Sequence, residues 1–309
     1  MAKTADQLLA GLKRRGILPA SQSLLSNADI LAMADDIIEL ELVSLVMSTR
    51  SEFFVTRSFE PLVSGQEAYD IPSRSIGRGL RDLKVRDGSN TYDLPQVEVE
   101  DWTVFGSGTG QPRGFTFLGD KILIGPTPAP ASGQQLELWW HLKPSKLVPT
   151  SQACLVDSVA SGVITCVGVP STFTAQTQVD IVQGNSGCAI RAMDVTIQNV
   201  SGLQLTFMVD DIPSSVRKGD YVTLAGYSPV LMLPDECSQL LETMLAQRVL
   251  QSLSDFEGAG ALIEVIKDEK HQLLRILAPR VVGEPKKILN RNSLLRRGLA
   301  FNRFGWLQR

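Results

Sequence analysis

The sequence has few of the residues from which metal and redox sites are built. It contains two histidines, His141 and His271, and four cysteines among 309 residues. Neither histidine belongs to an HxxxH or HExxH pattern, and the cysteines show no CxxC spacing. We therefore expect no metal, no cofactor and reduced thiols. The cysteines are Cys154, Cys166, Cys188 and Cys237.

Signatures of catalysis are missing as well. The glycine-rich stretch 106–110 resembles a phosphate-binding loop, but no Lys-Ser/Thr pair follows it, and Pro112 stands where a helix would begin. No GxSxG elbow occurs with a partner histidine and acid. The adjacent carboxylates Asp35-Asp36 and Asp210-Asp211 are a weak metal signal, and solvated edges or turn caps explain them better. These absences predict that the protein is not an enzyme.

A long apolar run is also lacking, so no transmembrane helix is expected. In the first segment the basic residues 13–15 follow the apolar residues instead of preceding them, which is unlike a signal peptide. The net charge of −3 gives no global attraction to nucleic acid or to a membrane. We expect a soluble, cytosolic product without a membrane partner.

Two amphipathic helices are predicted before the C-terminal segment. Pro234-Asp235 marks the start of the first, with Asp235 as the capping residue. Gly258 and Gly260 are predicted to end it, and Pro279 ends the second. The apolar stripes are Leu241, Leu245, Val249 and Leu253 in the first helix, and Leu262, Ile266, Leu273 and Leu277 in the second.

Residues 286–309 differ sharply from the rest of the chain. They hold seven of the 30 Lys and Arg residues and none of the 33 Asp and Glu residues, which leaves an excess of ten acidic groups elsewhere. Large apolar side chains are interleaved, although disordered tails usually lack them. Arginine and aromatic residues together are typical of interface hot spots. The predicted docking residues are Lys286, Lys287, Arg291, Leu294, Leu295, Arg296, Arg297, Phe301, Arg303, Phe304, Trp306 and Leu307.

The tail thus predicts an arm that orders on a partner protein. Two alternatives remain open at this point. One is a strap that packs on its own domain. The other is nucleic-acid binding, because arginines neutralise phosphates and aromatic rings stack on bases.

The first 50 residues predict two helices, one over 4–16 and one that starts at a Ser26 or Asn27 cap and extends toward Thr49. From Phe53 the hydrophobic period changes to two, and a small antiparallel sheet is expected over 53–143. A short helical turn is expected within 95–102. The strand candidates are 53–59, 67–72, 80–85, 91–94, 115–118, 121–124 and 136–142.

Residues 150–228 are rich in Val, Thr, Ser and Gly, and turn signals recur among short strand patterns. This pattern favours a small barrel or sandwich. It lies between Pro149 and Pro229, so we expect a domain inserted at a loop. The strand candidates are 154–159, 162–167, 178–182, 189–193, 194–198, 203–209 and 220–224.

Four short motifs accompany this order of elements. They are Tyr69-Asp70-Ile71-Pro72, the Asp87-Gly88 turn between Leu83-Lys84-Val85 and Tyr92-Asp93-Leu94-Pro95, Trp102, and the hairpin from Phe117 to Ile124 that ends in Gly125-Pro126-Thr127-Pro128. The chain resembles the head-to-tail adaptor (connector) proteins of tailed bacteriophages, especially those of short-tailed phages. The resemblance covers about 53–143 and 229–278, and the helices of the first 50 residues fit in kind.

We expect an α+β fold with a helical domain, a small antiparallel sheet, an inserted all-β domain and an extended C-terminal tail. The expected segments are the N-terminal helices (1–50), the antiparallel β region (51–148), the inserted barrel-like domain (149–228), the helix pair that packs on the N-terminal helices (229–283), and the basic-aromatic docking tail (284–309).

The resemblance implies a structural protein of the virion neck, made in the host cytoplasm. It implies a twelvefold ring below the portal protein that extends the DNA channel without binding DNA specifically and offers a platform for tail or nozzle proteins. In that family a C-terminal extension docks on the portal, and here Phe301, Phe304, Trp306 and Leu307 would be buried while Arg296, Arg297 and Arg303 pair with acids. The alternatives are a nucleic-acid-binding protein and another structural component of the tail.

Overall fold

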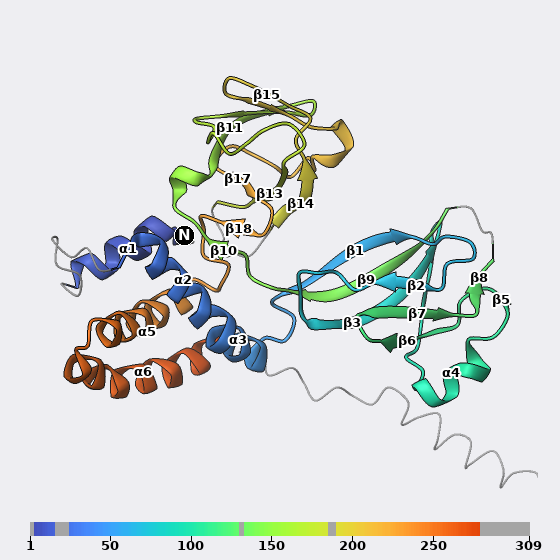
Figure 1. Cartoon of the computed structure of the whole chain (residues 1–309), viewed down its shortest axis with the longest axis horizontal. Coiled ribbons are helices and arrows are strands. Elements are labelled where there is room, and N and C mark those ends of the chain that lie inside the picture. Colours follow the sequence, from blue (N-terminus) through green and yellow to red (C-terminus); the bar gives the residue numbers. More distant parts are fainter. Residues whose placement is uncertain (1–2, 16–24, 130–132, 185–189, 279–309) are drawn as a thin grey trace, which may run out of the picture.

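The computed structural model describes residues 3–15, 25–129, 133–184 and 190–278 (Figure 1). The fold is a mixed α+β fold with several helices and mostly antiparallel sheets, as the sequence predicts. Three separate apolar clusters form the interior. We call the corresponding parts the helical core, the two-sheet region and the seven-stranded unit.

The helical core joins helices from both ends of the described chain (Figure 1). Thr4 and Ser26 close capping boxes at the starts of the first two helices, so these starts follow from local sequence. The second helix continues through a π-helical segment to Thr49, as expected. The elements are α1 (Ala5–Arg14), α2 (Asn27–Ile37), η1 (Ile38–Leu42), α3 (Val43–Thr49), α5 (Cys237–Ser252) and α6 (Phe256–Leu277).

The start of α5 and the turn between α5 and α6 differ from the predictions. The N-cap position of α5 is Glu236, one residue after the predicted position at Asp235. The predicted break at Gly258 and Gly260 is wrong, because both glycines lie inside α6. The break comes earlier, where Ser254 has a φ of 63°. Asp255 then caps α6 by accepting a bond from the Gly258 amide at 2.9 Å, which offsets the roughly 1 kcal/mol that a helical glycine costs.

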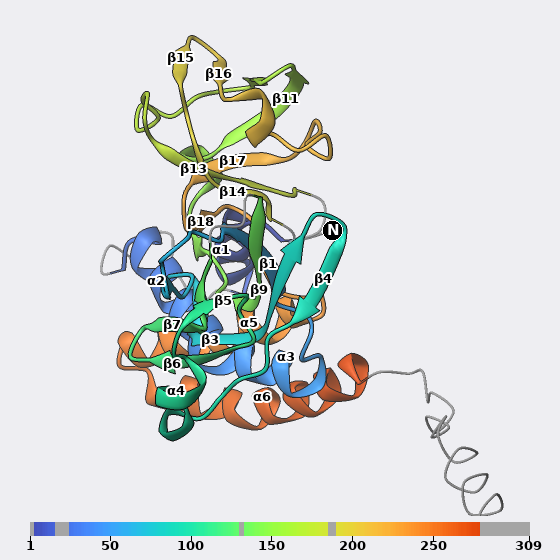
Figure 2. The ribbon, with the colours of Figure 1, turned by 90° about the vertical axis from the view of Figure 1, so that its right-hand side faces the viewer.

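The two-sheet region corrects the prediction of one small sheet. A four-stranded sheet (β1-β9-β3-β4) lies over a three-stranded one (β2-β7-β6), and a short parallel pair, β5-β8, lies beside them (Figures 1 and 2). Alternate apolar residues such as Leu138 and Ile122 meet between the sheets. The elements are β1 (Val55–Pro61), β2 (Ala68–Asp70), β3 (Ser75–Asp87), β4 (Asn90–Asp93), α4 (Val99–Phe105), β5 (Thr109–Gly110), β6 (Gly114–Leu118), β7 (Lys121–Gly125), β8 (Thr127–Pro128) and β9 (Gln134–Leu142).

The seven-stranded unit has the strand order β14-β13-β17-β11-β12-β16-β15. The chain enters it through β10 (Lys146–Leu147) and leaves through β18 (Tyr227–Ser228), which pair in parallel. The two strand candidates 189–193 and 194–198 fall on one strand, which passes Asp194 with a φ of 54°. The elements are η2 (Thr150–Gln152), β11 (Cys154–Ala160), β12 (Val163–Cys166), β13 (Gln178–Val182), β14 (Ile190–Thr196), β15 (Asn199–Ser201), β16 (Gln204–Thr206), η3 (Val209–Asp211) and β17 (Tyr221–Leu224).

Candidate interaction surfaces

The predicted docking residues, from Lys286 to Leu307, lie outside the described residues. The structure does describe the end of α6, which precedes the tail in the sequence. Leu277, at the end of α6, is fully buried. Its carbonyl oxygen accepts a bond from Arg50 Nε at 3.1 Å, just after α3. The end of α6 is therefore fixed on the helical core.

The outer side of α6 carries exposed apolar side chains. Phe256 is 72% exposed, and Ile263 is 45% exposed. These residues are seven positions apart and so share one face of the helix. The neighbouring stripe, three positions further along, carries the buried residues Ala259, Ile266 and Leu273, and the last two belong to the helical core. The helical core therefore presents an apolar strip near the start of α6.

A buried carboxylate holds the N-terminal segment on the helical core. Glu242, in α5, forms ion pairs with Lys3, which precedes α1, and with Arg15, which follows α1. Arg15 also donates to the Thr243 hydroxyl at 3.1 Å. Between these cations Gly11 lies directly against the Glu242 carboxylate, where a Cβ would collide with it. An acidic residue within the apolar pattern of α5 is the one sequence signal that points to this site.

A second buried carboxylate joins the two-sheet region to the seven-stranded unit. Asp180, in β13, is fully buried and lies 2.8 Å from the Arg74 guanidinium. It also accepts bonds from the backbone amides of Asp194 and Gly226, each at 3.0 Å. Burial raises the pKa of Asp180, and the Arg74 charge opposes that effect. Sequence reasoning missed this pair, because no local pattern links residues 106 positions apart.

A cleft of about 570 Å³ opens beside this ion pair. Its walls carry the carboxylates of Glu60, Asp70, Asp120 and Asp194, together with Arg74. Asp70 pairs with Lys121 at 3.7 Å, and Arg74 is held by Asp180. No group of three His, Cys, Asp or Glu side chains in the described parts of the chain is arranged to hold a metal ion.

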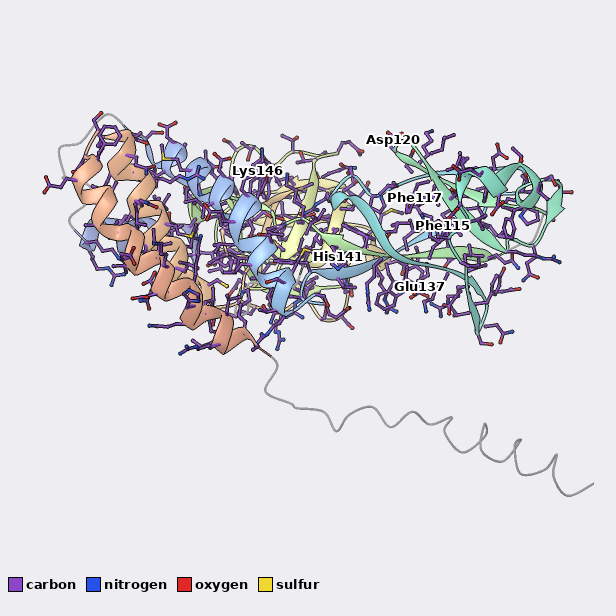
Figure 3. All side chains as sticks on the ribbon, turned by 90° about the horizontal axis from the view of Figure 1, so that it is seen from below. Phe115, Phe117, Asp120, Glu137, His141 and Lys146 are labelled. Atoms are coloured by element: carbon purple, nitrogen blue, oxygen red, sulfur yellow. The ribbon has the colours of Figure 1, made fainter. Side chains whose placement is uncertain are left out.

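The outer face of the four-stranded sheet combines arginines with an aromatic ring. Arg57 and Arg86 lie over the Phe59 ring, with guanidinium carbons 5.5 and 5.7 Å from its centroid. Beneath them Glu137 is buried and lies 3.6 Å from Arg57. In Figure 3 Glu137 is on one side of the stacked sheets, and Phe117 of β6 is on the other. We call the surface made by Arg57, Phe59, Arg86 and Glu137 the arginine face.

The helix α4 forms a contrasting surface. Glu98, Val99, Glu100, Asp101 and Val104 are exposed on or just before it, and Val104 is 82% exposed. Its inner side is fixed by Trp102, because a Cβ on Gly125 would lie 2.9 Å from the Trp102 Cη2 atom. The helix is thus a rigid support for an acidic and apolar surface.

The histidines and cysteines have structural surroundings. His141 Nε2 lies 3.1 Å from the Ser51 carbonyl oxygen. Cys154, Cys166 and Cys237 are buried. A hydrogen bond with Cys166 and burial raise the pKa of the Cys154 thiol, so this thiol is a poor nucleophile at neutral pH. No helix in the described ranges has the length and apolarity that crossing a membrane requires.

A comparison of the sequence with models of protein families finds a match. The family described as "SU10 adaptor protein" matches residues 4–169. The chain belongs to this family of phage head-to-tail adaptors. The resemblance stated from the sequence is therefore confirmed, and the protein is a phage adaptor, a structural component of the virion. A comparison with curated proteins finds no match.

The matched range covers some parts of the fold and omits others. It contains α1 to α3 and the whole two-sheet region, and it ends just after β12 of the seven-stranded unit. It does not contain α5 and α6, although α1 and α2 pack against α5 in the helical core. The second half of the resemblance, over 229–278, lies outside the matched range and stays a prediction.

Proposed function

We propose that the protein binds below the portal as a ring of twelve copies, extends the DNA channel and provides the platform to which tail or nozzle proteins attach. The observation that carries this proposal is the adaptor family match over residues 4–169. The proposed place is the virion neck, after synthesis in the host cytoplasm.

The C-terminal tail is the proposed contact with the portal. The helix that precedes it, α6, is held at its end on the helical core by the Arg50–Leu277 bond. Arginine and aromatic residues are enriched where interfaces gain most of their affinity. Phe301, Phe304, Trp306 and Leu307 would supply buried area. Arg296, Arg297 and Arg303 would pair with portal carboxylates.

The charge distribution supports a channel through which DNA passes without specific binding. The chain outside residues 286–309 has an excess of ten acidic groups, and like charges disfavour adhesion of a polyanion. The tail alone has the opposite sign. This division would place the net positive charge at the portal contact and leave the rest of the ring with a net negative charge that repels phosphate.

The test uses the portal protein of the same phage. The full chain and a truncation that ends at Gly283 are mixed with portal rings, sedimented at moderate salt, and the fast fraction is imaged by electron microscopy. We expect the full chain to form a ring below the portal and the truncated chain to stay free. Equal binding of both forms would refute the assignment of the tail, and failure of both would refute portal binding.

Two sets of substitutions separate the roles within the tail. Replacing Phe301, Phe304 and Trp306 by Ser removes burial at constant charge, and replacing Arg296, Arg297 and Arg303 by Gln removes charge at similar size. Both sets should weaken portal binding, but only the second should reduce its dependence on salt. Binding of the full chain to duplex or single-stranded DNA, with a steep loss as salt rises, would favour the nucleic-acid alternative instead.

A further inference from the structure

We propose that α4 of one copy packs on the arginine face of the next copy, so that the two-sheet regions join head to tail. This inference rests on the ring in the proposed function and names the two surfaces that would meet in it. The occupant of the arginine face is a second copy of this chain, and its contact segment is residues 98–104.

The first argument is the position of the two surfaces. In Figure 2, α4 lies on one side of the two-sheet region, whereas β1 and β4 lie on the other. Figure 3 places Phe117 and Glu137 on opposite sides of the same sheets. Two different surfaces that meet between identical copies form a heterologous contact, which can repeat from copy to copy and closes into a ring when the rotation permits. A surface pairing with itself would stop at a dimer.

The second argument is complementary charge. Glu98, Glu100 and Asp101 are exposed and lie within four residues that contain no basic group. None of them forms an ion pair with another described residue of its own chain. On the arginine face, Arg86 likewise has no carboxylate partner in the described ranges, and its Nε donates only to the Gly88 carbonyl oxygen, at 3.3 Å. Opposite potentials of this kind steer association and select the register.

The third argument is the exposed apolar area at the centre of each of the two surfaces, α4 and the arginine face. Val99 and Val104 are 54% and 82% exposed on α4, and Phe59 is 39% exposed between its two arginines. Covering these groups by one another would remove apolar surface from water. An aromatic ring held by arginines is also a typical interface anchor. The basic tail of the chain is a poorer occupant, because the arginines would repel it.

The rigidity of both surfaces favours this contact further. Trp102 and Phe105 fix α4, and each lies against a glycine that leaves no space for a Cβ. The arginine face is supported by the pairing of β1 with β9 along its whole length. Association therefore requires little ordering of the chain, which lowers its entropic cost.

Photocrosslinking detects this contact even when association is weak. Val104 is replaced by p-benzoylphenylalanine in the full chain, which is irradiated at about 1 mM, a concentration that populates complexes of millimolar Kd. The control carries the same group at Leu118, which is also exposed in the two-sheet region. We expect crosslinks between copies from position 104 to β1 or β3, and none to these strands from position 118. No crosslink between copies from position 104, or crosslinks only elsewhere, would overturn the inference.

A charge exchange tests the register. Arg86→Glu and Glu100→Lys should each weaken self-association at least about tenfold in sedimentation velocity, because like charges then face each other. A mixture of the two variants should associate as the natural protein does, since every contact regains opposite charges. Asp268→Lys, an exposed control on α6, should change nothing. Failure of the mixture to recover would overturn the inference, provided that circular dichroism shows both variants folded.

Portal sedimentation distinguishes this inference from the proposed function. If the natural protein crosslinks as expected but never binds portal rings, the contact between copies stands and the portal assignment fails. If it binds portal rings without any crosslink from position 104, the portal assignment stands and this inference fails.

Discussion

The helical core and the seven-stranded unit differ in how the chain brings their parts together. The helical core unites α1, α2 and α3 with α5 and α6, and the entire β structure lies between them in the sequence. The seven-stranded unit is one continuous stretch between β10 and β18. Closing long loops costs entropy before any contact forms. The stability of the helical core should therefore depend on the whole chain, and that of the seven-stranded unit on local contacts.

The buried ion pairs of the helical core and of the seven-stranded unit also differ in what they connect. Glu242 joins two segments of one core, and apolar packing of α1 against α5 surrounds it. Asp180 joins two separate parts of the molecule through one arginine. A buried ion pair contributes little net stability, but it costs much when one partner is lost. The Arg74–Asp180 pair, which we call the joint, thus fixes the orientation of the seven-stranded unit relative to the two-sheet region. The pairs of Glu242 with Lys3 and Arg15, which we call the clamp, add to a core that apolar packing already holds together.

The largest expected effects compare two fully buried leucines, Leu245 in α5 and Leu205 in β16. Replacement by Ala should cost about 3 kcal/mol in each case, from lost burial and the cavity left behind. Leu245→Ala should lower the urea midpoint of the helical circular dichroism signal. Leu205→Ala should leave that midpoint nearly unchanged and increase hydrogen exchange in β12 and β16. Equal shifts of the helical signal would show that the two parts unfold as one.

The joint between the two-sheet region and the seven-stranded unit gives the next effect. Arg74→Met leaves Asp180 buried without its cation, which should cost about 2–3 kcal/mol at the joint. Hydrogen exchange should rise in β13 and β14 while the helical core stays protected. Adding Asp180→Asn should recover part of the loss. Lys218→Met, which removes an exposed ion pair with Asp157, is the matched control and should cost less than about 0.5 kcal/mol.

The clamp at Glu242 predicts opposite outcomes for two glycines in helices. Gly11→Ala places a methyl group against the Glu242 carboxylate and should destabilise the helical core by about 1–2 kcal/mol. Gly260→Ala in α6 meets no atom within 4 Å, so it should stabilise by about 0.5–1 kcal/mol through higher helix propensity. Urea denaturation of both variants measures the difference. A stable Gly11→Ala variant would mean that α1 is not fixed by this contact.

The parts of the fold that could be predicted are those with a local cause. The capping boxes at Thr4 and Ser26 and the two-residue period of β1 and β9 are visible in short windows of sequence. The split into two sheets could not be predicted, because it depends on which faces meet. The prediction that Gly258 and Gly260 end a helix failed for a related reason. Their low helix propensity was outweighed by the Asp255 cap and by the packing of α6.

The candidate interaction surfaces were less accessible from the sequence. The basic-aromatic tail is a pattern of composition and could be recognised, although its residues lie outside the described ranges. The arginine face could not, because Arg57 and Arg86 come from strands that are not even adjacent in the sheet. The Arg74–Asp180 pair is hidden in the same way.

The smallest predicted effect concerns Asp35, which connects the helical core to the strand where the seven-stranded unit begins. Its carboxylate accepts a bond from the Leu147 amide of β10 at 2.9 Å. Burial raises the pKa of Asp35 to about 6, above its ordinary value of 3.8, although the Leu147 bond opposes this effect. The folded state therefore binds a proton more tightly than the unfolded chain. The resulting stability is present below the ordinary pKa and is lost as the pH rises through about 6.

Asp35→Asn keeps an acceptor for Leu147 and removes the charge. Because Asp35 is only half-buried, solvent screening limits the gain to about 1 kcal/mol at pH 8. At pH 4 the variant and the natural protein should have nearly equal urea midpoints, since Asp35 is then mostly protonated in the folded state. Asp36→Asn, at the exposed neighbouring position, should show no such pH dependence. A loss of stability at pH 8 would mean that the charge of Asp35 strengthens the bond to β10 more than its burial costs.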